Sequence, residues 1–164
     1  MLKVIGLGDN VVDQYLSLET IFPGGCALNF AVYASMLGKD ASYMGVFGDD
    51  FPAQVVQNAL KNHNVAYPRC RFTKVHVTLC DGDRVFVKSN KGAPMRHNPW
   101  QFDREDLEYL NGFDLIHVSC FSHMEDHMHL LKDLKPFVSY DFANYYTEEL
   151  LAKICPCIDY AIVS

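Results

Sequence analysis

The sequence predicts a doubly wound α/β fold, in which a mostly parallel sheet carries helices on both faces and a small β unit is attached. Short apolar segments alternate along the chain with segments of helical periodicity, and glycines and helix-capping residues mark their ends. A hairpin signal at Asp81-Gly82 interrupts this alternation. Since strands covered on both faces form continuous apolar runs, we expect the sheet to lie between two layers of helices.

The first predicted strand, residues 2–8, is short and apolar and ends in glycine. Gly6-Leu7-Gly8 is not a dinucleotide-binding fingerprint, because Val11 stands where the third glycine belongs and no helix pattern follows. Asp9 and Asp13 follow the strand, four residues apart. Carboxylates accept hydrogen bonds from sugar hydroxyls, so both are candidate sugar ligands. Two solvated loop acids would give the same pattern.

A second short strand is expected at residues 15–18, and a helix follows a Gly-Gly pair. Its apolar positions recur with helical spacing until Gly38, a glycine placed just past the helix end. Gly24 and Gly25 would leave the first backbone N–H groups uncovered and let a ligand approach the main chain. Asn29, one turn later, can both donate to and accept from a hydroxyl. This is a candidate polyol site; a tight turn before a capped core helix is the alternative.

The middle of the chain continues the alternation and then departs from it. A strand is predicted at residues 41–47 and a helix at 51–62, with Asp50 as its N-cap. The segments 72–80 and 84–87 are rich in β-branched and apolar residues and flank a two-residue turn signal. They predict an antiparallel hairpin that does not belong to the parallel sheet.

The second half returns to strand–helix alternation. A helix capped by Asp103 is expected at residues 103–110, followed by a buried strand at 114–118. The remaining predicted elements are a strand at 136–141, a helix at 147–153 capped by Thr147, and a strand at 158–163.

The segment from Ser122 to His127 allows three interpretations. His123 and His127 have the spacing of one helix face and, with Glu125 and Asp126, could bind a metal. Ser122 and Glu125 also form a capping-box pattern ahead of an apolar helix. Loops after parallel strands face the ligand side, so substrate contact is the third alternative. The capped helix start is the interpretation we favour.

Composition excludes several classes of protein. The 164 residues carry 14 basic and 20 acidic side chains without a basic cluster, so neither nucleic acid nor a membrane is an expected partner. No signal peptide or membrane-length apolar run is present, and the six cysteines are expected to be reduced thiols of a cytoplasmic protein. Cys155-Pro156-Cys157 lacks a second ligand pair, so no metal site is predicted.

The stretch Gly24-Gly25-Cys26-Ala27-Leu28-Asn29-Phe30-Ala31 resembles the first signature of the ribokinase/PfkB family of sugar kinases. Gly38 and Gly48 match the later glycines of that signature, and the segment from Gly6 to Asp13 resembles the family's first strand and its substrate-binding aspartate. Within the family the fructoselysine 6-kinases are most similar. This similarity rests on Gly8-Asp9-Asn10, Ala31-Val32-Tyr33, Asp83-Arg84-Val85-Phe86, His123-Met124-Glu125-Asp126 and Asp141-Phe142.

The resemblance implies a ribokinase-like domain with a small β lid, built from strands at about 13–18 and 72–88. It implies that Asp13 holds substrate hydroxyls, and that Cys26 stands where many relatives carry Lys or Asn. With the candidates from the residues themselves, the predicted substrate-binding set is Asp9, Asp13, Gly24, Gly25 and Asn29.

The resemblance also implies an activity: ATP-dependent transfer of phosphate to a hydroxyl of a fructosamine such as fructoselysine, or of a related ketose. ATP and Mg²⁺ would be the cofactors, a small-molecule sugar the ligand, and a homodimer could form through the lid. The family's Gly-Ala-Gly-Asp and Asn-x-x-Glu motifs have no match here. We therefore expect the catalytic and main nucleotide-binding residues to lie outside residues 1–164, leaving a catalytically incomplete N-terminal part. The alternatives are a same-family kinase of another sugar or nucleoside, and a truncated, non-catalytic binding module.

Overall fold

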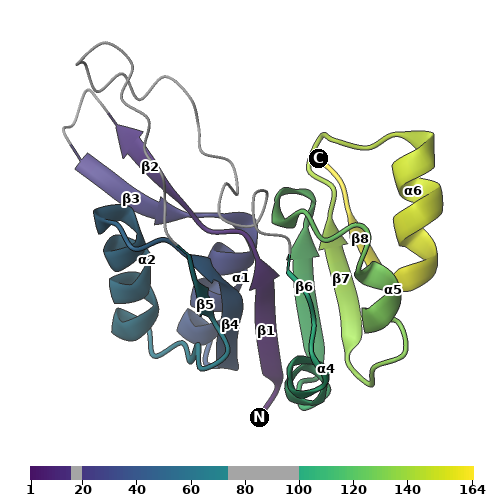
Figure 1. The fold of residues 1–164 in the computed structure, drawn as a ribbon, viewed down its shortest axis with the longest axis horizontal. Helices are drawn as coiled ribbons and strands as arrows, with labels where there is room; N and C mark the ends of the chain where they lie inside the picture. Colours follow the sequence, from purple (N-terminus) through teal and green to yellow (C-terminus); the bar gives the residue numbers. More distant parts are fainter. Residues whose placement is uncertain (16–19, 74–99) are drawn as a thin grey trace.

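The structure is a computed structural model that describes residues 1–15, 20–73 and 100–164 (Figure 1). Its main sheet consists of β1 (Lys3–Gly8), β4 (Asp40–Phe47), β5 (Arg71–Phe72), β6 (Leu115–Ser119), β7 (Phe137–Asp141) and β8 (Tyr160–Ile162). Within the described residues the strand order is β5-β4-β1-β6-β7-β8, and each neighbouring pair is parallel. The predicted parallel sheet is confirmed.

Helices cover both faces of this sheet. They are α1 (Cys26–Met36), α2 (Phe51–Asn62), α4 (Arg104–Leu110), α5 (Met128–Leu131) and α6 (Glu148–Ile154). Successive side chains of β1 divide between two apolar clusters, because neighbouring residues of a strand point to opposite faces. Val4 packs in the cluster that contains residues of α1 and α2, whereas Ile5 and Leu7 pack with residues of α4, α5 and α6. The doubly wound arrangement predicted from the sequence is therefore confirmed.

Local signals place the helices as expected. The Asp50 side chain accepts a hydrogen bond from the backbone N–H of Ala53 at the start of α2. Asp103 caps α4 in a reciprocal capping box, and Thr147 caps α6. Gly6 allows α1 to lie directly on the sheet: a Cβ there would stand 2.0 Å from a carbonyl oxygen of that helix.

A small second sheet adjoins the carboxyl end of β1 (Figure 1). It pairs β2 (Val11–Tyr15) with β3 (Thr20–Gly24) in antiparallel register. Of the strand predicted at residues 15–18, only Tyr15 is described, and it is the last residue of β2, which follows β1 after two intervening residues. Residues 16–19 lie outside the described part of the chain.

The predicted hairpin at residues 72–87, and with it the second lid segment at 72–88, falls almost entirely outside the described residues. Phe72 is described, and it belongs to β5, which pairs in parallel with β4. Among the helices of the described residues, none combines the length and the apolar character that crossing a bilayer requires.

Candidate functional site

The carboxyl ends of three parallel strands meet where α1 begins. Gly8 ends β1, Ser119 ends β6 and Asp141 ends β7, and their parallel pairing places all three at one edge of the sheet. The small sheet of β2 and β3 rises from this same edge, and β3 leads directly into α1 (Figure 1). In open α/β sheets this edge is where ligands bind.

The entrance of α1 is covered by the carboxylate of Asp9, contrary to the expectation of uncovered N–H groups. Gly25 is the N-cap residue and offers no side chain to the helix. Asp9 takes its place: Oδ2 accepts from the N–H of Cys26 at 2.6 Å, and Oδ1 accepts from the N–H of Ala27 at 3.2 Å. A carboxylate at a helix N-terminus is favoured because it faces the positive end of the helix dipole.

Asp9 is also tied to β6. Its side chain is only 2 % exposed. The Ser119 hydroxyl donates to Oδ1 at 2.7 Å, and the Ser122 hydroxyl lies 3.0 Å from the same oxygen. One carboxylate therefore joins the end of β1, the start of α1 and the end of β6 through hydrogen bonds.

Asp13 is the exposed member of the site, and it lies beside the two glycines. Asp13 lies exposed on β2, and a Cβ at Gly24 would stand 2.6 Å from its Oδ2 atom. Gly25 has a φ of 113°, and a Cβ there would stand 2.8 Å from the backbone of Asn10 and of Asp9. Gly25 is therefore required for the turn, whereas Gly24 leaves room for the Asp13 carboxylate in its present position.

Asn29 lies one helical turn beyond the glycines. Its backbone N–H donates to the carbonyl of Gly25 at 2.8 Å, and its side chain is exposed. The structure therefore gathers Asp13, Gly24 and Gly25 into one corner, with Asn29 on the first turn above it. Asp9 lies beneath them, buried and fully engaged with protein donors.

Two residues that sequence reasoning missed hold the backbone between β1 and β2. The Asn10 amide donates to the hydroxyl of Tyr43 at 2.8 Å and to the carbonyl of Val46 at 2.9 Å. The Tyr43 hydroxyl, fully buried, donates to the carbonyl of Gly8 at 2.7 Å. Gly45 makes room for it, since a Cβ there would stand 2.1 Å from that hydroxyl. The sequence signal that could have indicated this buried hydroxyl was a tyrosine followed two residues later by a glycine within an apolar strand.

Negative charge dominates this edge. Burial first, and then the charges of Asp9 and Asp141, raise the pKa of Cys26 to about 11. Burial, followed by Asp141 and other neighbours, raises the pKa of Cys120 to about 12. Both thiols therefore stay protonated near neutral pH and are poor nucleophiles. Burial lowers the pKa of His117, whose ring stacks on Phe30 with centroids 4.5 Å apart.

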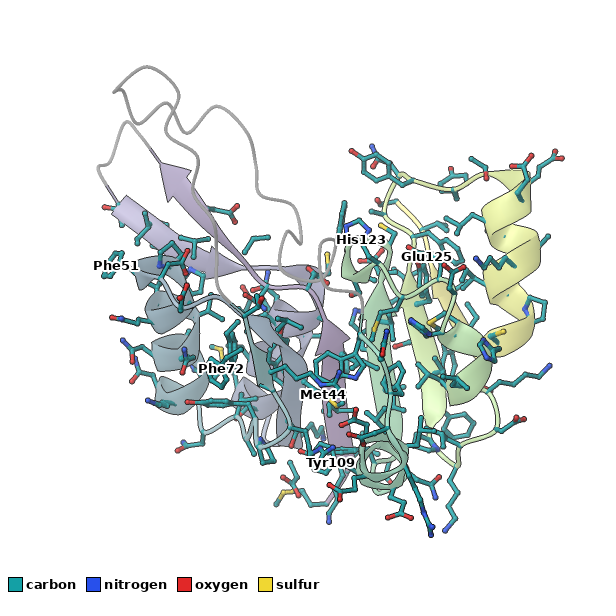
Figure 2. All side chains as sticks on the ribbon, viewed as in Figure 1. Met44, Phe51, Phe72, Tyr109, His123 and Glu125 are labelled. Carbon is teal, nitrogen blue, oxygen red and sulfur yellow. The ribbon has the colours of Figure 1, made fainter. Side chains whose placement is uncertain are left out.

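The structure of the loop after β6 contradicts the capped helix start that we favoured for residues 122–127. Ser122 ends a 3₁₀ turn (Cys120–Ser122), and its capping partner is Ser119, so the predicted capping box with Glu125 is wrong. His123 adopts a left-handed conformation with φ 51°, and α5 begins only at Met128, so His123 and His127 do not share a helix face. Figure 2 shows His123 and Glu125 near the carboxyl ends of β6 and β7.

Two acidic side chains of this loop already interact with other side chains of the protein. Glu125 accepts a hydrogen bond from the hydroxyl of Tyr140 at 3.2 Å, and Asp126 pairs with Lys153. Within the described residues, no group of three or more His, Cys, Asp or Glu side chains is placed to hold a metal ion.

The family is decided by comparison with known proteins. The model of the pfkB family of carbohydrate kinases matches residues 8–163, which is nearly the whole chain and includes the Gly24-Gly25 corner. The chain belongs to the pfkB family.

Two curated proteins named as kinases of fructosamines are similar to this pfkB-family chain in sequence. The chain is 40 % identical to the fructosamine kinase FrlD of Bacillus subtilis over 171 residues, covering 99 % of this chain and 59 % of that protein. It is 28 % identical to the fructoselysine 6-kinase of Escherichia coli, covering 96 % of this chain and 61 % of that protein. The chain thus spans about 60 % of the length of these relatives.

Solved structures of similar proteins support the fold. A carbohydrate kinase from Agrobacterium tumefaciens superposes with a TM-score of 0.70 at 16 % identity, covering 98 % of this chain and 60 % of that one. A fructokinase with bound ATP from Xylella fastidiosa gives 0.69 at 15 % identity, covering 97 % and 56 %. At these identities the likeness shows the pfkB-family fold alone.

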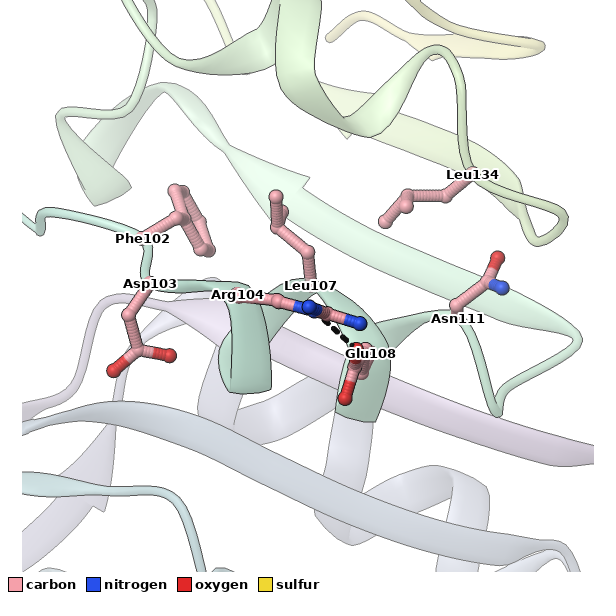
Figure 3. A pocket seen from close by; sticks show the side chains of 7 residues that line it. All are labelled: Phe102, Asp103, Arg104, Leu107, Glu108, Asn111 and Leu134. Carbon is pink, nitrogen blue, oxygen red and sulfur yellow. Dashed lines mark hydrogen bonds and ion pairs between the residues drawn. The ribbon is translucent and has the colours of Figure 1, made fainter.

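A hollow elsewhere on the surface does not belong to this site. It has a volume of about 410 Å³ and is lined by residues of α4 and by Leu134 (Figure 3). Asn111 and Leu134 precede β6 and β7, so the hollow lies toward the amino ends of these strands, opposite the Gly24-Gly25 corner. It is open to solvent, and its Arg104 and Glu108 pair with each other at 2.7 Å.

Proposed function

We propose that this chain provides the sugar-binding part of an ATP-dependent kinase that phosphorylates a hydroxyl of a fructosamine, such as fructoselysine. The observation that carries the proposal is the 40 % identity, over nearly the whole chain, to a protein named as a fructosamine kinase. A related ketose or another sugar of the same family is the alternative acceptor.

The proposed sugar contacts are Asp13, Gly24, Gly25 and Asn29. The exposed carboxylate of Asp13 accepts hydrogen bonds from neighbouring sugar hydroxyls, and Gly24 leaves room beside it. The exposed amide of Asn29 supplies both a donor and an acceptor from the first turn of α1. Asp9 was predicted from the sequence to contact the sugar, but its buried position favours a different role.

The same corner is unsuited to a phosphate group. Two of the first N–H groups of α1 are already bound by Asp9, whose negative charge would repel a phosphate. We therefore propose that ATP and Mg²⁺, which supply the transferable phosphoryl group and its charge neutralisation, are held elsewhere. In this proposal the contribution of the Gly24-Gly25 corner is to bind and orient the acceptor.

Asp13→Asn tests the sugar site in the full-length gene product, assayed for ATP-dependent phosphorylation. A hydrogen bond to a charged group is worth roughly 1.5–3 kcal/mol, so the KM for fructoselysine should rise roughly 10- to 150-fold. The KM for ATP should not change. Asp133→Asn, an exposed carboxylate at the opposite edge of the sheet, is the matched control. An unchanged sugar KM would remove Asp13 from the site, and a preference for fructose, ribose or a nucleoside over fructoselysine would replace the proposed acceptor.

We also propose that residues 1–164 alone do not turn over ATP, because the relatives extend well beyond the part they share with this chain. Intact mass of the purified protein should come first. Phosphorylation of fructoselysine by a product of 18.6 kDa would refute this proposal.

A further inference from the structure

We propose that Asp9 is a positioning residue: it sets the start of α1, and with it the Gly24-Gly25 corner and Asn29, without contacting the sugar. This inference rests on the proposed function for its kinetic consequence. Its structural basis is independent of that function, since it follows from the contacts of one buried carboxylate.

Helix α1 has no cap of its own. Its N-cap residue, Gly25, makes no side-chain hydrogen bond to the helix. The first two N–H groups of the helix instead donate to Asp9, which lies 17 and 18 positions earlier in the chain. A helix whose cap comes from a separate strand has its starting point fixed by that strand. Here the strand is β1, and the segment held between them is the substrate corner.

Asp9 also has no free side for a ligand. Oδ1 is within hydrogen-bond distance of the Ser119 hydroxyl, the Ser122 hydroxyl and the N–H of Ala27, and Oδ2 accepts from Cys26. The carboxylate is 2 % exposed. Oδ1 has three donors and Oδ2 has one, and burial together with the close approach of Gly25 keeps a sugar hydroxyl from the carboxylate.

Gly25 packs closely against Asp9. A Cβ at Gly25 would stand 3.0 Å from Oδ2 and 2.8 Å from the backbone oxygen of Asp9. The space between the carboxylate and the glycine therefore does not admit even a methyl group. A sugar can lie against Gly25 on its outer side, whereas Asp9 stays behind the main chain.

The test compares Asp9→Asn with Asp13→Asn in the full-length protein. Asn keeps the size of Asp9 but replaces one acceptor oxygen by a donor, so at least one N–H of α1 loses its partner. Amide hydrogen exchange at Cys26 and Ala27 should quicken at least tenfold in Asp9→Asn and stay unchanged in Asp13→Asn. The KM for the sugar should rise at least tenfold in Asp9→Asn, while the KM for ATP stays within twofold of the parent protein.

A double-mutant cycle separates positioning from direct contact. If Asp9 acts through α1, the KM effects of Asp9→Asn and Asn29→Ala should be strongly non-additive, because the first change already displaces the Asn29 side chain. Additive effects, or a raised KM without faster exchange at α1, would show direct sugar contact and overturn the proposal. Faster exchange with an unchanged KM would overturn it as well.

Cys26 supplies a readout that needs no enzymatic activity. Burial and, after it, the charge of Asp9 raise the pKa of this thiol, so removal of that charge should make iodoacetamide label Cys26 several-fold faster near pH 9. If the protein phosphorylates no sugar, the proposed function fails. The labelling and exchange results would still test the contact between Asp9 and α1, so the two failures can be told apart. If Asp9→Asn does not fold, Ser119→Ala removes a donor to the same carboxylate and should give smaller changes in the same direction in hydrogen exchange and in the sugar KM. Its labelling is not compared, because the Ser119 hydroxyl itself lowers the pKa of Cys26.

Discussion

Asp106 offers a sharp test of how the described segments are held together. It is 1 % exposed on α4, yet it binds two arginines. Arg69 donates to Oδ1 at 2.6 Å, and Arg71 donates to Oδ2 at 2.6 Å. The indole N–H of Trp100 also donates to Oδ2 at 3.2 Å, and the Arg71 guanidinium lies 4.2 Å from the centre of the indole ring. This cluster joins the chain segments on either side of residues 74–99.

Asp106→Asn should destabilise the protein by about 2–3 kcal/mol. Removing one partner of a buried ion pair costs roughly 3–5 kcal/mol. The value here is lower because the side chains of Arg69 and Arg71 are 28 % and 39 % exposed and water can solvate them again. For a domain of this size the melting temperature should fall by roughly 4–12 °C. Glu105→Gln is the matched control, since Glu105 also pairs with Arg69 but is 79 % exposed, and surface pairs contribute roughly 0–1 kcal/mol.

The assay follows thermal unfolding by circular dichroism together with the fluorescence of Trp100, the one tryptophan of the sequence. Loss of the hydrogen bond and of the stacked guanidinium should change the Trp100 emission of the folded variant below its melting temperature. A melting temperature within about 1 °C of the parent protein, with unchanged emission, would refute the view that Asp106 is the centre of this cluster.

Two further predictions concern the site and its neighbourhood. In Gly24→Ala the new Cβ would crowd the end of the Asp13 side chain, which can rotate away; the sugar KM should rise at least about fivefold with little change in melting temperature, and an unchanged KM would contradict the proposed corner. Burial lowers the pKa of His117 below its unfolded value of 6.5, so the unfolded state binds the proton more readily. The stability that His117 contributes should be fully present above pH 6.5 and decline as pH falls toward the lowered pKa. His117→Gln should therefore flatten the dependence of the melting temperature on pH between about pH 5 and pH 7, and an unchanged dependence would contradict this role of His117.

Much of the fold could be predicted because its signals are local. Strands appear as short apolar runs, and the caps at Asp50, Asp103 and Thr147 each act on an N–H three residues away. The Gly24-Gly25 pair is likewise local, since the turn and the close approach occur at the glycines themselves. These patterns were sufficient for the α/β class and for α2, α4 and α6.

The failures occurred where a distant partner decided the outcome. Ser122 and Glu125 have the spacing of a capping box, but the Ser122 hydroxyl faces Asp9, which is 113 positions away in the chain. The N–H groups of α1 were expected to be free, and a carboxylate from β1 binds them. A periodic pattern in the sequence does not indicate which distant side chain will become the hydrogen-bond partner of a given group.

The sequence by itself determined the strand–helix alternation of the main sheet, the glycines of the corner and the resemblance to the family, because each depends on residues that are close together in the chain. Only the tertiary structure decided the role of Asp9. Parallel pairing of β1 with β6 brings Ser119 and Ser122 to its carboxylate, and the packing of α1 on the sheet brings the helix N-terminus to the same point. The physical reason is burial: a carboxylate without water must satisfy its acceptors with whatever donors the fold brings to it.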